Sequence, residues 1–294
     1  MASGTMPTVS IILPCYNGER WLPETISSIL AQTFQDFELI VVDDGSTDGT
    51  PAILESIAHE PRTTVIRQPN HGIPATHNRG LREAQGEFIA YIQQDDLWLP
   101  EKLALQVEAF RQSDPSVGLI YGQAYHIDEA GRIFKLQRPP EYPQHELLRH
   151  LIEDGGFVPI VTTLIRRACY ERVGLHDESL YGCDDYDLWL RLAPHFAFLR
   201  LEEPLAKLRY HPGRASHDER MCLDRFTIAV KLQRLYPEMR NSMDRYLCRS
   251  HFDYGRFLVE HGRLREARQQ FLQAVRHRPG WPYPYRHYLK SFFR

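Results

Sequence analysis

One stretch of the sequence decides the fold: Gly86-Glu87-Phe88-Ile89-Ala90-Tyr91-Ile92-Gln93-Gln94-Asp95-Asp96-Leu97-Trp98-Leu99-Pro100. Residues 88–92 predict a buried strand, because an apolar run this short is too brief for a helix. Adjacent carboxylates repel each other and lose hydration where such a strand ends. Asp95 and Asp96 therefore predict a cation or a donor-rich ligand at its carboxyl end. Alternatively, the two acids begin the next helix, with Pro100 at its first position.

Strands and helices alternate up to residue 112, which predicts an α/β fold with a mainly parallel sheet covered on both faces. The expected strands are residues 8–13, 37–42, 64–67 and 88–92, and the expected helices are 22–30, one from Thr50 or Pro51, 74–84 and 100–112. Loops that follow parallel strands converge along one edge of the sheet. Those loops carry Tyr16, Asp43, Asp44, His77, Asp95 and Asp96.

The pattern changes after residue 112, and we expect the sheet to become mixed. Two short strands are predicted at 118–122 and 125–128, and a turn leads into a third at 133–136. The Pro-rich stretch 137–143 predicts an exposed loop.

A second pair of acids, Asp184 and Asp185, falls at or just before the first turn of a helix. The apolar face of that helix is expected to consist of Leu188, Trp189 and Leu192. Acids at a helix start are ordinary N-terminal caps, but one or two caps do not require three acids. These carboxylates are therefore candidates for chemistry as well as for capping.

The composition is that of a globular chain with an appendage. The chain has 294 residues, a 43% hydrophobic content and a formal net charge of -3, which indicates no nucleic-acid partner. Five cysteines without a Cys-x-x-Cys pair predict neither a disulfide framework nor a zinc cage, and fit a reducing cytoplasm. No apolar run approaches the roughly 20 residues of a membrane span, and residues 1–5 do not look like a signal peptide. We expect a cytoplasmic protein, or one on the inner face of a membrane.

Five motifs resemble those of the family-2 glycosyltransferases, which are inverting enzymes with a GT-A, Rossmann-like fold that binds nucleotide sugars. They are VSIILPCYN (9–17), VVDDGSTDGT (41–50), GEFIAY (86–91), DDLWLP (95–100) and DDYDLW (184–189). The resemblance implies a hexosyltransferase-type enzyme of polysaccharide biosynthesis that uses a nucleoside-diphosphate sugar and a saccharide or lipid-linked acceptor. It implies a GT-A domain at 1–217, followed by a helical extension at 218–294.

The resemblance also implies roles for individual residues. Tyr16 and either Asp43 or Asp44 contact the nucleotide base. Asp95 helps to hold a divalent cation, Mn²⁺ or Mg²⁺, and Asp185 is the catalytic base. The substrate-binding set is Pro14, Tyr16, Asn17, Glu19, Asp43, Asp44, His77, Asn78, Gln94, Asp95, Asp96, Asp184, Arg209, Arg214 and Ser216, and the metal set is Asp95 and His211.

Elementary chemistry agrees with these roles. Cleavage of a sugar from a nucleoside diphosphate leaves negative charge on the diphosphate, and a hard cation held by carboxylates stabilises that charge. An acceptor hydroxyl is a weak nucleophile, so a carboxylate on the far side of the anomeric carbon removes its proton as the bond forms. A single displacement of this kind inverts the anomeric centre.

Two positions depart from the family's pattern. The family usually has Asp-x-Asp where this chain has Gln93-Gln94-Asp95, and often has Arg-Asn where this chain has His77-Asn78. Residues 208–216 resemble the segment that closes over the donor diphosphate, with Arg209, His211, Arg214 and Ser216 suited to phosphate. The alternative for 208–216 is an ordinary exposed basic loop.

The C-terminal end is helical and markedly basic, with ten Lys or Arg and three acids from Arg249 onward. The spacing of a single tetratricopeptide-type hairpin is followed by Tyr254, Gly255, Gly262, Ala267, Phe271, Ala274 and Pro279. One such repeat cannot bury its own faces, so we expect it to pack on the preceding helices or on another subunit in a homo-oligomer. The aromatic and basic tail 281–294 suits either a membrane surface or packing against the core.

Two rival functions remain open from the sequence. Gln93 and the helical end are compatible with a non-catalytic nucleotide- or carbohydrate-binding module. A nucleotidyltransferase has less support, because no Gly-rich phosphate loop follows the first strand.

Overall fold

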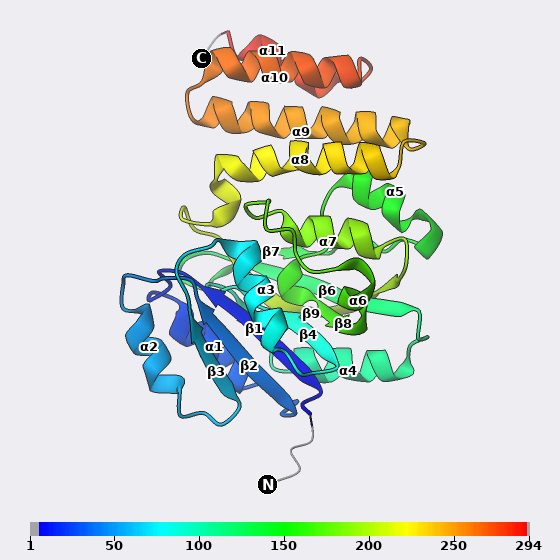
Figure 1. The fold of residues 1–294 in the computed structure, drawn as a ribbon. Coiled ribbons are helices and arrows are strands. Elements are labelled where there is room, and N and C mark those ends of the chain that lie inside the picture. The colour runs from blue at the N-terminus through cyan, green and yellow to red at the C-terminus, as the bar shows by residue number, and fades with distance from the viewer. Residues whose placement is uncertain (1–5, 293–294) are drawn as a thin grey trace.

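The computed structural model describes residues 6–292, and over this range nine strands form one sheet (Figure 1). The strand order is β3-β2-β1-β4-β8-β6-β9-β5, with β7 paired to β6. The four parallel strands of the first half are β1 (Val9–Cys15), β2 (Phe37–Asp43), β3 (Thr63–Arg67) and β4 (Phe88–Tyr91). The predicted α/β class and the mainly parallel first half are confirmed.

The second half of the sheet is mixed, as expected. It consists of β5 (Leu97–Trp98), β6 (Val117–Ile127), β7 (Ile133–Gln137), β8 (Leu164–Arg166) and β9 (Ala197–Arg209). The prediction of two short strands at 118–122 and 125–128 is wrong, because β6 is continuous. The pairing of β6 with β9 runs from Val117 to Ile127. Its register shifts around Gln123, but the strand is not interrupted there.

Helices cover both faces of the sheet, so β1 is buried on both sides. Val9, Ile11 and Leu13 point into a core shared with α1 and α4, whereas Ile12 points into the opposite core with α3, α5 and α7. The helices of this part are α1 (Leu22–Leu30), α2 (Thr50–Ile57), α3 (Ile73–Glu83), α4 (Lys102–Gln112), α5 (Gln144–Asp154), α6 (Ala168–Val173) and α7 (Asp184–Leu192).

The turn after β4 leaves its two acids outside any helix. Asp95 and Asp96 are followed by the short strand β5, which pairs antiparallel with β9, and α4 begins only at Lys102. The alternative that these acids begin the next helix is therefore wrong. Packing explains the difference, since the Trp98 indole is buried and donates a hydrogen bond from Nε1 to the carbonyl oxygen of Val161 at 2.9 Å.

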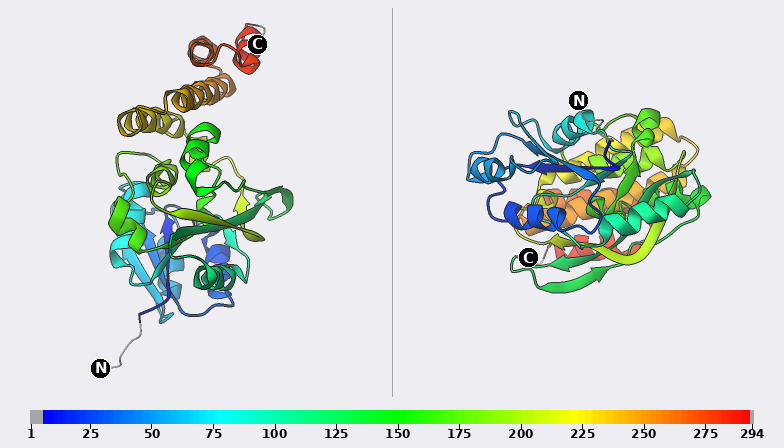
Figure 2. Two further views of the ribbon diagram at one scale, coloured as in Figure 1. Left: turned by 90° about the vertical axis from the view of Figure 1, so that its right-hand side faces the viewer. Right: turned by 90° about the horizontal axis from the view of Figure 1, so that it is seen from below.

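Four further helices stack one on another away from the sheet (Figures 1 and 2). They are α8 (Glu219–Leu235), α9 (Arg240–Glu260), α10 (Leu264–His277) and α11 (Pro282–Lys290). The predicted helical extension is confirmed. Gly255 lets α9 approach α10, because a Cβ there would lie 2.6 Å from Phe271 Cε1. The tetratricopeptide likeness and the domain boundary at 217/218 stay predictions.

The helical stack is anchored to the α/β body through α8 and α9. Ile228, Ala229 and Leu232 of α8 belong to the same core cluster as α7, together with Met243 and Tyr246 of α9. Among the described residues, no helix is long and apolar enough to cross a membrane.

Candidate active site

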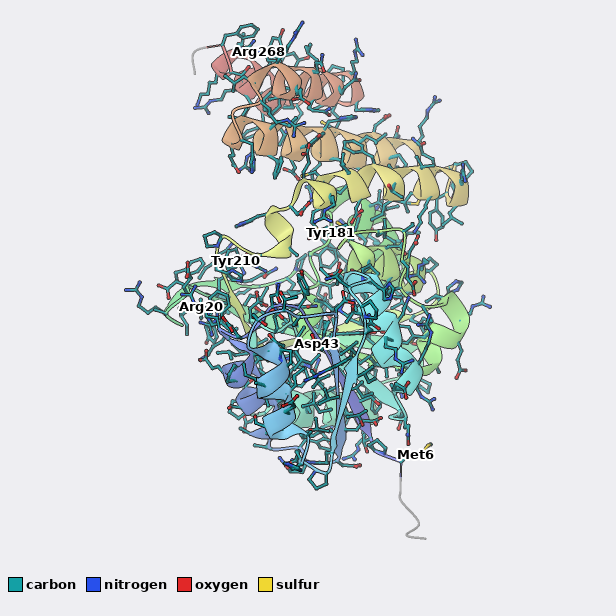
Figure 3. The ribbon with its side chains drawn as sticks, turned by 60° about the vertical axis from the view of Figure 1, so that its left-hand side comes forward. Met6, Arg20, Asp43, Tyr181, Tyr210 and Arg268 are labelled. Carbon is teal, nitrogen blue, oxygen red and sulfur yellow. The ribbon has the colours of Figure 1, made fainter. Side chains whose placement is uncertain are left out.

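A cavity of about 560 Å³ lies at the carboxyl edge of the parallel strands. That volume falls in the range of small-molecule sites. The predicted site residues that line it are Pro14, Tyr16, Asp44, His77, Gln94, Asp95, Asp96, Asp184, Asp185, His211 and Arg214. Tyr181 also lines it, between the sheet and the stacked helices (Figure 3). Loops that are far apart in the sequence thus meet at one edge, as expected.

Gln94 fixes the turn that follows β1. Its Oε1 accepts from the Tyr16 amide at 2.8 Å, and its Nε2 donates to the Tyr16 carbonyl oxygen at 3.0 Å. Gly18 leaves room for this amide, since a Cβ there would lie 2.4 Å from Gln94 Oε1. With its backbone held in this way, the Tyr16 ring stays 46% exposed at the rim of the cavity.

Three predicted substrate-binding residues accept hydrogen bonds from backbone amides of the loop after β2 and do not line the cavity. Asn17 Oδ1 accepts from the Thr47 amide at 2.8 Å. Glu19 Oε2 accepts from the Gly49 amide at 2.6 Å. Asp43 Oδ1 accepts from the Ser46 amide at 3.0 Å.

Asp44, next to them, does line the cavity and also orders the loop beyond β3. Its carboxylate accepts from Gln68 Nε2 at 2.8 Å and from the amides of His71 and Gly72, both at 2.9 Å. Asp44 is therefore held in place by the loop of residues 68–72, of which Gly72 also lines the cavity.

The acids after β4 meet the loop after β9. Asp95 Oδ2 lies 2.7 Å from His211 Nε2, and the His211 ring lies against Trp21 with 4.3 Å between ring centroids. Asp96 is buried and accepts from the Arg209 amide at 2.9 Å. Burial and the neighbouring Asp95 charge raise the pKa of Asp96 to about 8. A carboxylate oxygen and an imidazole nitrogen at a cavity wall are donors that suit Mn²⁺, so these residues fit a divalent cation.

Two further predicted site residues are structural. The Arg209 guanidinium is buried and does not line the cavity; it donates to Glu24 Oε2 at 2.6 Å and to the Asp95 carbonyl oxygen at 3.0 Å. Asn78 Nδ2 donates to the His176 carbonyl oxygen at 2.9 Å. In contrast, Arg214 lines the cavity above the Tyr210 ring, at 4.3 Å from its centroid. The side chain of Ser216 lies outside the described residues.

Asp184 is the centre of a buried network. Its Oδ2 lies 2.8 Å from His77 Nδ1 and 2.7 Å from His176 Nδ1. Burial alone would raise the pKa of Asp184, but the two imidazoles hold it well below its usual range. On the far side, His176 Nε2 lies 3.0 Å from the Tyr91 hydroxyl. Sequence reasoning missed His176, which stands in a segment without a recognisable local pattern.

The trio His77, His176 and Asp184 has atoms close enough to hold a metal ion. All three side chains are almost fully buried, with exposures of 1%, 0% and 2%. The His77 Nδ1–Asp184 Oδ2 contact is a hydrogen bond, whereas the His176 Nδ1 atom lies close to Asp184 without hydrogen-bond geometry. The geometry therefore fits a buried ion-pair cluster better than a cation site that a diphosphate could reach.

The two departures from the family's pattern lie side by side. Gln93 Nε2 is 3.4 Å from His77 Nε2, and both residues line the cavity. A neutral amide thus meets an imidazole whose other nitrogen is bound to Asp184.

Asp185 is the second residue of α7 and lines the cavity, half-buried. Its Oδ1 accepts from the Tyr186 amide at 2.6 Å. Burial and the adjacent Asp184 charge raise the pKa of Asp185 to about 7. A carboxylate with a pKa near neutrality is well suited to accept and release a proton.

Comparison with known proteins decides the family. The family model described as glycosyl transferase family 2 matches residues 10–174, more than half of the chain. The chain belongs to glycosyl transferase family 2. This membership confirms the resemblance to the family-2 glycosyltransferases that was inferred from the motifs.

Relatives of this family-2 protein are described as glycosyltransferases. An uncharacterized glycosyltransferase of Rickettsia felis is 32% identical over 216 residues, which cover 71% of this chain and 35% of that protein. One of Methanocaldococcus jannaschii is 28% identical over 235 residues, covering 78% of this chain and 77% of that protein. The chain spans about a third of the length of the relatives from R. felis and R. conorii.

Solved structures confirm the predicted GT-A fold. Staphylococcus aureus TarS 1–349 in complex with UDP has a TM-score of 0.66 and 21% identity, covering 97% of this chain and 89% of that one. The mannosyltransferase PcManGT of Pyrobaculum calidifontis, in complex with GDP-Man and Mn²⁺, has a TM-score of 0.62 and 20% identity, covering 98% and 81%. At these identities the likeness concerns the fold alone.

Proposed function

We propose that this glycosyltransferase transfers a sugar from a nucleoside-diphosphate sugar to an acceptor hydroxyl, with inversion at the anomeric carbon and with Asp185 as the general base. The observation that carries the proposal is the place of Asp185, a half-buried carboxylate at the cavity wall with a raised pKa. A carboxyl that titrates near pH 7 removes the acceptor proton more effectively than an ordinary exposed acid.

Another part of the cavity wall, which includes Tyr16, suits the donor. The exposed Tyr16 ring offers a flat surface for a nucleotide base, with Pro14 and Asp44 beside it. UDP in TarS and GDP-Man in PcManGT make a nucleotide sugar the natural ligand class to test here. Arg214, at the same wall as Asp95, offers a guanidinium for the diphosphate.

Asp95 and His211 are the residues that would hold a divalent cation. When bound, such a cation supplies positive charge that stabilises the departing diphosphate. The chain's own groups prepare this position: Trp21 orients the His211 ring, and Arg209 holds the backbone of Asp95.

For the acceptor we propose a saccharide or a lipid-linked saccharide. The support is the basic and aromatic C-terminal end, where Tyr285, Arg286, Leu289, Lys290 and Phe292 are exposed on or just after α11. Such a surface suits the anionic headgroups around a lipid-linked acceptor.

The test is a panel of nucleotide sugars, first screened by thermal stabilisation and then assayed for nucleoside-diphosphate release with Mn²⁺ or Mg²⁺. Turnover with at least one donor, lost on adding a chelator, is the expected result. Binding without turnover across donors and acceptors would instead favour a non-catalytic binding module.

A further inference from the structure

Helix α8 presses one row of side chains against the segment that carries Asp185. Arg220, Asp224, Ile228 and Lys231 recur at helical spacing, so they share one face of the helix. The Arg220 guanidinium carbon lies 3.7 Å from the centroid of the Tyr181 ring, and both residues line the cavity. At the other end of the row, Lys231 Nζ donates to Asp187 Oδ1 at 2.6 Å.

Asp224, in the middle of this row, binds three consecutive backbone amides. Its Oδ2 accepts from Tyr181 at 2.9 Å, from Gly182 at 2.9 Å and from Cys183 at 3.0 Å, and its Oδ1 is 3.0 Å from the Tyr181 amide. The side chain is buried, with 6% exposure. Successive amides that converge on one carboxylate form a strong anion-binding turn.

These amides belong to the turn directly before Asp184 and Asp185. Cys183 precedes the first turn of α7, and its thiol does not cap that helix but faces the Met221 carbonyl oxygen of α8 at 3.5 Å. Gly182 is also packed on α8, because a Cβ there would lie 2.6 Å from Met221 Sδ. The backbone entering α7 is thus shaped by α8.

We propose that Asp224 is a positioning residue for sugar transfer, which fixes the direction of the Asp185 carboxylate by holding the amides of residues 181–183. The C-terminal extension then completes the active site as well as packing against it. The proposal rests on the proposed role of Asp185 as the base. Its physical basis is that misplacement of a reacting group by about 1 Å can cost about 10²-fold in rate.

The variant Asp224→Asn tests this in the full-length protein, because it preserves shape but replaces one acceptor oxygen with an NH₂ group that faces amide donors. The matched control is Asp244→Asn on α9, which removes a carboxylate that pairs with His277 at 3.0 Å far from the cavity. Hydrogen–deuterium exchange of residues 177–186, binding of UDP or GDP with Mn²⁺, and steady-state turnover are measured for both.

We expect Asp224→Asn to speed exchange of the 181–183 amides at least about tenfold and to lower kcat about 10- to 100-fold. KM for the donor and the dissociation constant of the nucleoside diphosphate should change less than about threefold, since the nucleotide end of the cavity is untouched. Asp244→Asn should match the wild type in all three measurements. This split between kcat and KM distinguishes positioning from a general loss of stability.

Two results would overturn the proposal. One is unchanged exchange at residues 181–183, which would mean that Asp224 does not hold the turn. The other is faster exchange with wild-type kcat, which would mean that the turn does not position the base. Exchange is read without substrate, so it still decides whether Asp224 holds the turn if the wild type transfers no sugar and the proposed function itself fails.

Discussion

Two neighbouring carboxylates at the start of α7 have opposite pKa shifts because they face different surroundings. Asp184 meets two imidazoles, and its pKa lies well below the usual range. Asp185 meets no such partner, and burial beside Asp184 raises its pKa to about 7. Adjacent acids whose environments separate their pKa values are typical of sites with divided roles. In this division Asp184 is the permanently charged structural acid, and Asp185 is the acid that titrates.

Replacing Asp185 by Asn is the direct test of the base. The amide keeps the shape and loses basicity, so we expect transfer to fall about 10²- to 10⁴-fold while nucleoside-diphosphate affinity changes little. The control is Asp187→Asn, whose carboxylate is bound by Arg191 and Lys231 and should matter for stability more than for the chemical step. Two results would show that the base is another carboxylate. One is near wild-type transfer by Asp185→Asn, and the other is that Asp187→Asn alone abolishes transfer although the protein remains folded.

The raised pKa of Asp185 also sets the pH dependence. Only the ionised carboxylate accepts a proton, so log kcat/KM should rise with a slope of about one through pH 7 and level off above it. As the pH falls below 7, protonation removes the base and the rate falls tenfold per unit. In the Asp185→Asn variant the residual rate should lose this limb. An acid limb centred near pH 4 in the wild type would contradict the shift.

At the scale of elements, local sequence was enough to predict β1, β2 and β4, because each is a short apolar run that ends in polar residues. It was not enough for β5, whose two residues pair with Lys207 and Ala206 far along the chain. The candidate site follows the same rule. Residues at strand ends, such as Asp44 and Asp95, were placed correctly at the cavity, whereas the roles of His176 and Asp224 depend on contacts that only the folded chain creates.

The contact between α3 and α7 through His77 and Asp184 makes a testable contribution to stability. Removing a hydrogen-bond partner of a buried group costs about 1–3 kcal/mol and more where the group left behind is charged, so we expect His77→Ala to lower the free energy of unfolding by about 3 kcal/mol. The control Arg79→Ala, on the exposed side of α3, should change it by less than about 0.5 kcal/mol. Urea unfolding followed by circular dichroism measures both. Equal effects of the two substitutions would contradict the buried pair.

At the scale of the whole molecule, the α/β body and the helical stack are joined through a shared core, while the far end of the stack presents an exposed aromatic and basic surface. On α11, Tyr285 and Leu289 are 42% and 60% exposed, and Phe292 beyond it is 53% exposed. Their spacing places them on one side of the helix, next to Arg286 and Lys290. Trp281, in contrast, packs on Phe252 with 5.0 Å between ring centroids. The sequence left open whether the tail faces a membrane or packs on the protein, and the structure shows one packed residue at its start and exposed residues further along.

The contrast between packed Trp281 and the exposed residues of α11 determines how membrane association should be tested. Deleting the tail before Trp281 would remove a packed aromatic, so the better variant is Arg286→Glu with Lys290→Glu, which changes only exposed side chains. Each basic residue near an anionic surface contributes about 1 kcal/mol, so we expect the double variant to sediment with phosphatidylglycerol vesicles at least about tenfold less. Nucleoside-diphosphate binding should be unchanged, because α11 lies at the end of the stack away from the sheet (Figure 2), whereas the cavity is lined by Arg220 of α8 and by residues of the α/β body.

The matched control reverses the same charge elsewhere, with Arg111→Glu and Arg172→Glu on α4 and α6, both exposed and away from α11. If attraction to the vesicle were a matter of net charge alone, the control would lose as much binding as the α11 variant, because the two have the same charge. Selective loss in the α11 variant, weakened in the wild type by added salt, would place the contact on this helix. Equal binding by all three proteins would reject the membrane surface and leave α11 with a packing role.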